Sequence, residues 1–294
     1  MKNKQNWNSY AAKYSARVHS DSEIIAIINN PAKAFHETTW KLIKTYIPDK
    51  KDKLHPNKDS NLPILKGKKI CVPSSGDNRA VFAFAMLGAQ VTSCDFSENQ
   101  LANAERIAKQ YSWGNSIEFI CADTMALDEV PDNTYDFVYT SNGVHVWIHD
   151  LPAMYHNIHR ITKPGGMYIM SEIHPFQRPF DEAVKVIKPY DDTGPIESET
   201  MTNFHWRVMD IMNAILGSGL TALHMEEMFA EKDYDWPFWQ SMQDYMAGVT
   251  VPKEEVDRMH DWQHNPSAAL PTWLCIAARK SLRHTPKQPQ KTTQ

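Results

Sequence analysis

The loop Pro-Ser-Ser-Gly-Asp-Asn at residues 73–78 and the acid Asp95 are spaced as in a nucleoside-binding site. The loop joins an apolar run to a helical stretch. Its small residues let the backbone approach a ligand, and the helix offers free N–H groups. Asp95 follows at close to the ~20-residue offset at which an acid after a second strand binds ribose hydroxyls. The loop can also be a plain tight turn and Asp95 a helix cap. We favour Asp95 as the ribose ligand and Ser97 as the cap.

A second acid, Asp123, follows the third apolar run of the chain. Its carboxylate can accept a hydrogen bond from an exocyclic amine, while Met125 and Phe96 can flank a flat ring. Taken alone, Asp123 is equally well explained as a turn acid. The order is more informative than any one residue, because a small-residue loop and two acids come at three successive strand ends.

The elements that would position these residues alternate between short apolar runs and helical stretches. This pattern predicts a doubly wound, mostly parallel, Rossmann-like sheet of the α/β class. The carboxyl ends of its strands meet at one edge, where ligands bind. The later third predicts an antiparallel terminal strand in a hairpin that carries a long insertion. The expected strands are 69–73, 90–94, 116–121, 135–140, 167–172 (after a turn at 164–166), 220–226 and 271–279, and the expected helices are 78–87, 98–111, 151–162 and 204–216.

Composition and charge exclude several classes of protein. The chain has 294 residues, of which 42% are hydrophobic and 22% charged. A chain of this length and composition can bury a hydrophobic core without help from disulfides or structural metal ions. A net charge of −4 argues against a dedicated nucleic-acid binder. The cysteines form no C-x-x-C pair, and no apolar stretch approaches the ~20 residues that span a bilayer. We expect a cytoplasmic protein, a monomer or homodimer, that binds a small molecule and neither nucleic acid nor membrane.

Five segments in this order resemble a class I S-adenosylmethionine-dependent methyltransferase of the small-molecule type. They are ICVPSSGDN, GAQVTSCDFSENQLANA, FICADTMAL, YDFVYTSNGVHV and HNIHRITKPGGMYIMSE. The resemblance covers residues 66–280 with insertions. It implies an N-terminal helical lid and linker (1–60), a cofactor-binding domain (61–281) with cap insertions near 175–205 and 228–262, and a flexible tail (282–294).

The resemblance also implies which residues hold S-adenosylmethionine. The family's cofactor loop, ribose acid, adenine-edge acid and backbone near the sulfonium fall on positions at the four strand ends. These positions and their neighbours are Pro73, Ser74, Ser75, Gly76, Asn78, Asp95, Phe96, Ser97, Gln100, Asp123, Thr124, Met125, Ser141, Asn142 and Gly143. Two departures stand out. The family's glycine triplet reads Ser74, Gly76 and Asn78, where Asn tolerates a left-handed φ, and the usual acid before the loop is Val72.

The substrate side is expected to be covered by aromatic residues. Trp7, Tyr10, Ala11, Tyr14 and Val18 recur at helical spacing, similar to the family's lid helix, and Tyr14 is the candidate to touch the cofactor. Docking of this helix on the core alone explains the stripe equally well. A pocket of tryptophans would suit an aromatic or hydrophobic ligand. The candidates are Trp147, Trp206, Trp236 and Trp239.

Two histidines are candidates for a general base. His145 follows the fourth strand and His174 the fifth, so both point toward the edge where the methyl group is transferred. The spacing of the 13 histidines does not suggest a metal site, and methyl transfer needs none.

The expected activity is methyl transfer to an oxygen or nitrogen of a small, aromatic or hydrophobic metabolite. Three alternatives remain: a cofactor-binding protein that does not methylate, an RNA or protein methyltransferase, and an NAD-type dehydrogenase. The dehydrogenase motif G-x-G-x-x-G is matched at Gly76 alone.

Overall fold

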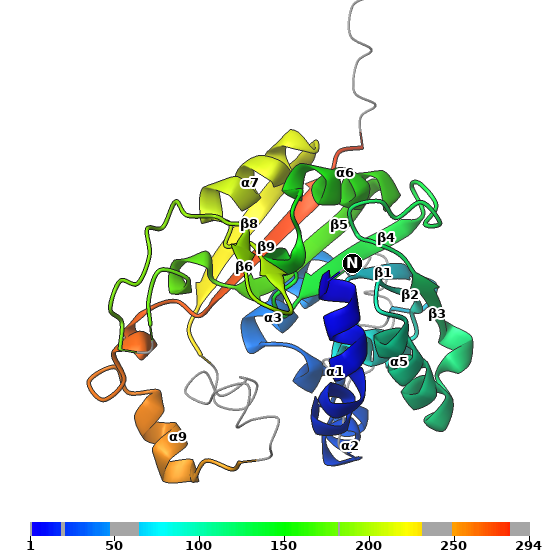
Figure 1. The fold of residues 1–294 in the computed structure, drawn as a ribbon. Helices are drawn as coiled ribbons and strands as arrows, with labels where there is room; N and C mark the ends of the chain where they lie inside the picture. The colour runs from blue at the N-terminus through cyan, green and yellow to red at the C-terminus, as the bar shows by residue number, and fades with distance from the viewer. Residues whose placement is uncertain (1, 19–20, 48–64, 182, 231–248, 283–294) are drawn as a thin grey trace, which may run out of the picture.

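The computed structural model describes residues 2–18, 21–47, 65–181, 183–230 and 249–282. One sheet of seven strands runs through it in the order β3-β2-β1-β4-β5-β9-β8 (Figure 1). Strands β1 to β5 pair in parallel, and β9 runs antiparallel to both β5 and β8. The predicted α/β class and terminal hairpin are therefore confirmed. The strands are β1 Lys69–Pro73, β2 Gln90–Asp95, β3 Ile117–Cys121, β4 Tyr135–Ser141, β5 Thr162–Ile173, β8 Leu220–Met228 and β9 Trp273–Lys280.

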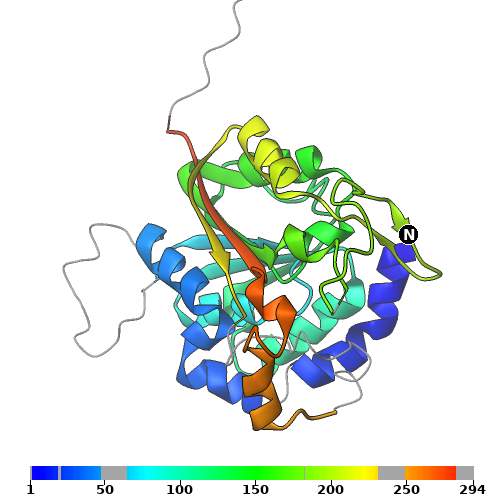
Figure 2. The ribbon, with the colours of Figure 1, turned by 90° about the vertical axis from the view of Figure 1, so that its left-hand side faces the viewer.

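Helices cover both faces of this sheet (Figures 1 and 2). Successive residues of β1 show why: Ile70 and Val72 pack in one hydrophobic cluster, and Cys71 packs in the other. The first cluster contains buried residues from four helices, which are α2 Asp21–Asn29, α3 Glu37–Tyr46, α4 Arg79–Met86 and α5 Glu98–Gln110. The second includes α6 Leu151–Ile161 and α7 Val208–Gly217. A strand that is buried on both faces reads as a continuous apolar run, which is how β1 and β4 could be predicted.

The remaining elements lie around the sheet. Helix α1 Lys2–Val18 packs against α5, and α9 Lys253–Met259 precedes the last strand. Strands β6 Ile196–Glu197 and β7 Thr202–Asn203 form a small hairpin within the 175–205 insertion. The predicted tail beyond residue 282 and the predicted linker after residue 47 lie outside the described residues.

Two predicted boundaries are wrong. The helix predicted from Phe204 begins at Val208, because the Phe204 N–H donates to the carbonyl of Val146 and Arg207 and Asp210 form a capping box. The predicted turn at 164–166 belongs to β5, which begins at Thr162 and shifts its register against β4 between Tyr135 and Phe137. The shift in register accommodates Gly165 and Gly166 within the strand, so β5 continues through them.

Candidate functional site

The loop 73–78 contacts three other segments at the carboxyl ends of the strands. The Gly76 N–H donates to Asp95 Oδ2 at 2.8 Å, and the Ser74 and Thr124 hydroxyls lie 2.6 Å apart. Asn78 Nδ2 donates to Ser141 Oγ at 2.8 Å. The structure thus brings together the four segments that the sequence singled out. We call residues 73–78, 95–100, 123–125 and 141–143 the carboxyl edge.

The departures from the family's glycine pattern have different structural consequences. Ser74 takes a left-handed φ of 49°, which a side chain disfavours, and its hydroxyl contact with Thr124 helps to hold it there. Gly76 has a φ of 52°. Asn78 does not use the left-handed conformation that we expected it to tolerate. Its φ is −57°, and its side chain caps α4 by accepting from the Ala80 N–H at 2.9 Å.

Asp95 is the buried acid at the end of β2 that accepts a hydrogen bond from the loop. Its side chain is 6% exposed, and its two oxygens accept from the Gly76 and Ser97 N–H groups, each at 2.8 Å. Burial raises its pKa to about 6, although both N–H donors favour the charged form. Each carboxylate oxygen keeps a second lone pair for a ligand. Ser97, as predicted, caps α5 by accepting from the Gln100 N–H at 3.3 Å.

Gln100 and Asp123 flank this loop in contrasting surroundings. Gln100 is buried, and its Oε1 has no hydrogen-bond partner in the described part of the chain. A Cβ placed on Gly76 would lie 3.6 Å from that oxygen, so the unpaired acceptor faces the loop. Asp123 is exposed, and its Oδ1 accepts from the Met125 N–H at 2.9 Å.

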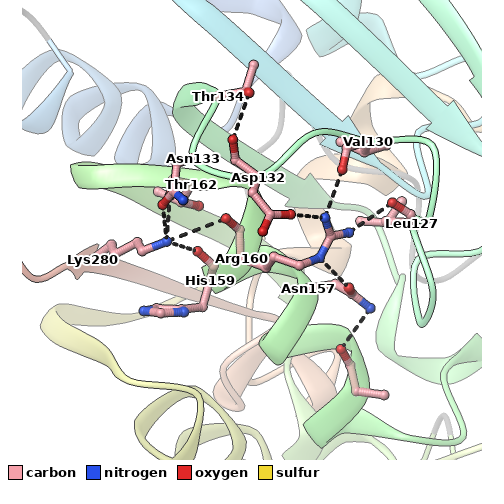
Figure 3. A network of polar contacts seen from close by, with 11 residues as sticks. Leu127, Val130, Asp132, Asn133, Thr134, Asn157, His159, Arg160, Thr162 and Lys280 are labelled. Atoms are coloured by element: carbon pink, nitrogen blue, oxygen red, sulfur yellow. Dashed lines mark hydrogen bonds and ion pairs between the residues drawn. The ribbon is translucent and has the colours of Figure 1, made fainter. Parts of the chain in front are cut away.

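A polar network behind Met125 fixes the segment after β3. Asn157 Nδ2 on α6 donates to the Met125 carbonyl at 2.8 Å, and Arg160 Nε donates to Asn157 Oδ1 at 3.1 Å. The Arg160 guanidinium also reaches the carbonyls of Leu127 and Val130 (Figure 3). The network ties the loop that carries Asp123 and Met125 to the core, so the loop is held in place before any ligand binds.

A small pocket, with an accessible volume of about 10 Å³, lies where β4 and β5 end, and we call it the β4–β5 pocket. Gly143, which has a φ of 88°, forms part of its wall beside the carboxyl edge. The 175–205 insertion and the start of α7 supply the opposite wall. The residues that line the pocket include Gly143, His145, Glu172, Arg178, His205 and Trp206.

The two candidate bases are placed differently. His145 lines the β4–β5 pocket, its Nε2 lies 2.8 Å from the Tyr155 hydroxyl, and burial lowers its pKa to about 3. His174 does not line this pocket. Its Nδ1 accepts from the Phe176 N–H at 3.1 Å, and its Nε2 lies 3.0 Å from Glu227 Oε1, so both ring nitrogens are engaged.

Helix α1 bridges the carboxyl edge and the 175–205 insertion (Figure 1). Near the middle of the helix, Asn8 accepts from Ser97 Oγ at 2.6 Å, and its backbone carbonyl accepts from Asn99 Nδ2 at 3.0 Å. At the N-terminal end, Asn3 exchanges two hydrogen bonds with the backbone of Thr202. This bridge connects the segment expected to bind the cofactor to the one expected to cover the substrate.

The aromatic candidates are only partly brought together. Trp206 lines the β4–β5 pocket, and its indole N–H donates to the Ile148 carbonyl at 2.8 Å. Trp147 packs edge-on against Trp7 with ring centroids 5.3 Å apart, and Tyr14 also packs edge-on against Trp7 at 5.8 Å. Trp236 and Trp239 lie outside the described residues.

Three pocket residues escaped the sequence reasoning. The sequence predicts Glu172 only as the last residue of a strand, and Arg178 and His205 only as part of the 175–205 cap insertion. The acid at the last position but one of β5 was the available signal for Glu172. No local pattern pairs it with Arg178 and His205, which reach the pocket through tertiary folding.

Within the described ranges, no three metal-ligating side chains cluster, and no helix is long and apolar enough to cross a membrane.

Comparison with known proteins agrees with this architecture. Residues 73–170 match the family described as a methyltransferase domain. A sterol 24-C-methyltransferase of Gibberella zeae, ERG6B, is 26% identical over 239 residues, which are 76% of this chain and 59% of the relative. A demethylmenaquinone methyltransferase of Lysinibacillus sphaericus is 29% identical over 58% of this chain and 71% of the relative. The chain thus spans less than two thirds of the sterol relative's length.

Solved structures share the fold. An S-adenosylmethionine-dependent methyltransferase from Mesorhizobium loti superposes with a TM-score of 0.54 and 21% identity, covering 74% of this chain and 94% of its own. The cyclase SpnF superposes with a TM-score of 0.51 and 18% identity, covering 74% of this chain and 76% of its own. Residues 73–170 thus match a methyltransferase domain, and the fold is that of S-adenosylmethionine-dependent methyltransferases of known structure, in agreement with the resemblance of the sequence motifs.

Proposed function

We propose that this protein transfers a methyl group from S-adenosylmethionine to an oxygen or nitrogen of a small, aromatic or hydrophobic metabolite. The observation that carries the proposal is the loop 73–78, which hydrogen-bonds Asp95, Thr124 and Ser141 at once. This arrangement places three features on one edge of the sheet. They are the backbone of a loop of small residues, the acid proposed to bind ribose, and the segment that follows β4.

The residues of the carboxyl edge fit the cofactor. Asp95 has free lone pairs on both oxygens, and the unpaired Gln100 Oε1 faces the loop, where a ligand donor would satisfy it. Exposed Asp123 is free on one oxygen to accept from an adenine amine. When bound, the cofactor supplies a methyl group already activated on a sulfonium. The protein therefore has mainly to position the acceptor and exclude water.

The β4–β5 pocket is the proposed acceptor side. It adjoins Gly143, where the family places the sulfonium, and Trp206 gives it an aromatic wall. Of the two candidate bases, His145 lines it, whereas His174 does not and is engaged at both nitrogens. Helix α1 and the 175–205 insertion would close over the bound ligands as a lid. The name of the first relative gives a sterol carbon as its acceptor, and the name of the second gives demethylmenaquinone. Both names support a small-molecule acceptor, and neither singles out an oxygen or a nitrogen.

A second candidate is a protein that binds the cofactor without methylating. Val72 is 1% exposed and apolar at the position of the family's amino-anchoring acid, and Ser74 holds a left-handed φ where the family has glycine. A fold shared with the cyclase SpnF is compatible with either function.

Methyl-labelled S-adenosylmethionine and a panel of phenols, enols and amines separate the two candidates. We expect label in at least one acceptor, together with released S-adenosylhomocysteine. Tight cofactor binding without label in any acceptor would support the non-methylating alternative. Absence of both would contradict the proposed function.

A further inference from the structure

The β4–β5 pocket contains polar atoms that no described residue satisfies. Glu172 Oε1, His145 Nδ1 and His205 Nδ1 are buried and have no hydrogen-bond partner in the described part of the chain. Buried polar atoms almost always have a partner, and an unmet one costs about 1–3 kcal/mol. Three such atoms around a space of about 10 Å³, which is room for one oxygen-sized group, indicate that a single small polar group is held there.

Glu172 is the enclosed acid of this group. Its side chain is 1% exposed, and its Oε2 lies 3.9 Å from His145 Nδ1, which is too long for a hydrogen bond. The N–H groups of residues 143–145 and the charge of Arg178 favour its ionised form, but burial outweighs them. Glu172 is therefore held beside the backbone of Gly143, with a free oxygen available to the pocket.

Arg178 supplies a positive charge on the opposite wall. It is half-buried, and its guanidinium makes no hydrogen bond or ion pair among the described residues. The opposite charge that it faces is Glu172. A guanidinium offers five donors and no acceptor, so it suits an oxyanion. A carboxyl group and a guanidinium facing one space can hold a single oxygen between them.

We infer that Glu172 and Arg178 bind the acidic hydroxyl of a phenol or enol, with Glu172 taking its proton and Arg178 holding the resulting oxyanion. This inference rests on the proposed function and narrows its acceptor class. In the transfer, the oxyanion forms the new O–CH3 bond while the C–S bond breaks, and the electron pair goes to sulfur. The proton on Glu172 then leaves to solvent. His145 is a positioning residue, because its ring stays neutral and its Nε2 is held by Tyr155.

The surrounding titratable groups favour this sharing of one proton. Burial raises the pKa of Glu172 to about 8, so its carboxyl is a better proton acceptor than an ordinary carboxylate. Burial and the charges of Arg178 and Lys188 lower the pKa of His205 to about 4, so His205 does not compete for the proton. The titratable groups around Glu172 come from several elements. They are His145 after β4, Tyr155 from α6, Tyr168 from β5, and Arg178. His205 and Lys188 lie near Arg178.

The experiment uses para-nitrophenol, whose phenolate absorbs visible light, and the full chain saturated with S-adenosylhomocysteine. We expect the wild type to bind the probe as phenolate. Its affinity should fall about tenfold per pH unit above pH 8, as Glu172 ionises and repels the oxyanion. Glu172→Gln should remove that pH dependence, and Arg178→Gln should weaken binding about tenfold or more. Arg106→Gln, on the exposed face of α5, is the matched charge control.

Each outcome decides. Failure of the cofactor-loaded wild type to bind the probe would overturn the inference, and so would an unchanged pH dependence in Glu172→Gln. Melting curves of each variant show that it is folded. Failure of S-adenosylhomocysteine to bind at all would instead contradict the proposed function, so the two failures are distinguishable.

Discussion

The carboxyl edge and the β4–β5 pocket are neighbours, but their polar groups are satisfied to very different degrees. At the carboxyl edge, Asp95, Ser74 and Asn78 are joined by hydrogen bonds within the protein, and Gln100 keeps one unpaired oxygen among the described residues. In the β4–β5 pocket, Glu172, His145 and His205 each keep a buried atom without a partner in the described part of the chain. The first region is preorganised by its own backbone. The second is completed by what binds there, so cofactor choice and acceptor choice are separable properties of this fold.

The largest expected effect is at Asp95. Asp95→Ala should weaken S-adenosylhomocysteine binding by ~2–4 kcal/mol, because two charge-assisted hydrogen bonds to ribose are lost. Asp123→Ala should cost only about 1 kcal/mol, since that acid is exposed. Titration calorimetry measures both, with exposed Asp128→Ala as the control. If the two variants lost equal amounts of binding free energy, the buried acid would contribute no more to cofactor binding than the exposed one, which would contradict the prediction.

The pH dependence of cofactor affinity should be of intermediate size. Burial raises the pKa of Asp95 to about 6, and the ionised form is the one that accepts both ribose hydroxyls. Affinity should therefore be constant above about pH 7 and fall as the pH drops through 6, because protonation removes an acceptor. Asp95→Asn, which does not titrate, should abolish this dependence in calorimetric titrations between pH 5 and 8. A wild-type profile that stays flat over that range would show that Asp95 does not bind the ribose.

A smaller effect is expected from the bridge that links the two regions. Asn8→Ala removes the side-chain hydrogen bonds of α1 to Ser97 and Glu98 and should cost about 1 kcal/mol in cofactor affinity. Exposed Gln5→Ala is the control on the same helix. Hydrogen exchange should slow in residues 7–18 and 175–205 when cofactor and acceptor are both bound. Protection confined to residues 74–78 would mean that α1 is not a lid.

The carboxyl edge could be predicted from sequence because its signals are local. A run of apolar residues predicts β1, and Asp95 marks the end of β2. A serine three residues before Gln100 predicts the cap of α5. The β4–β5 pocket could not be predicted, because Arg178 and His205 meet Glu172 only through tertiary folding. The start of α7 was missed for a related reason. The capping pair Arg207–Asp210 is unusual, and the preceding residues are held extended by a contact with Val146.

The central claim is that the carboxyl edge binds S-adenosylmethionine, and calorimetric titration of the wild type with S-adenosylhomocysteine tests it most directly. We predict one site per chain with micromolar affinity, lost in large part in Asp95→Ala while the melting behaviour of that variant remains cooperative. A wild type that is folded and shows no binding at millimolar S-adenosylhomocysteine would contradict the claim.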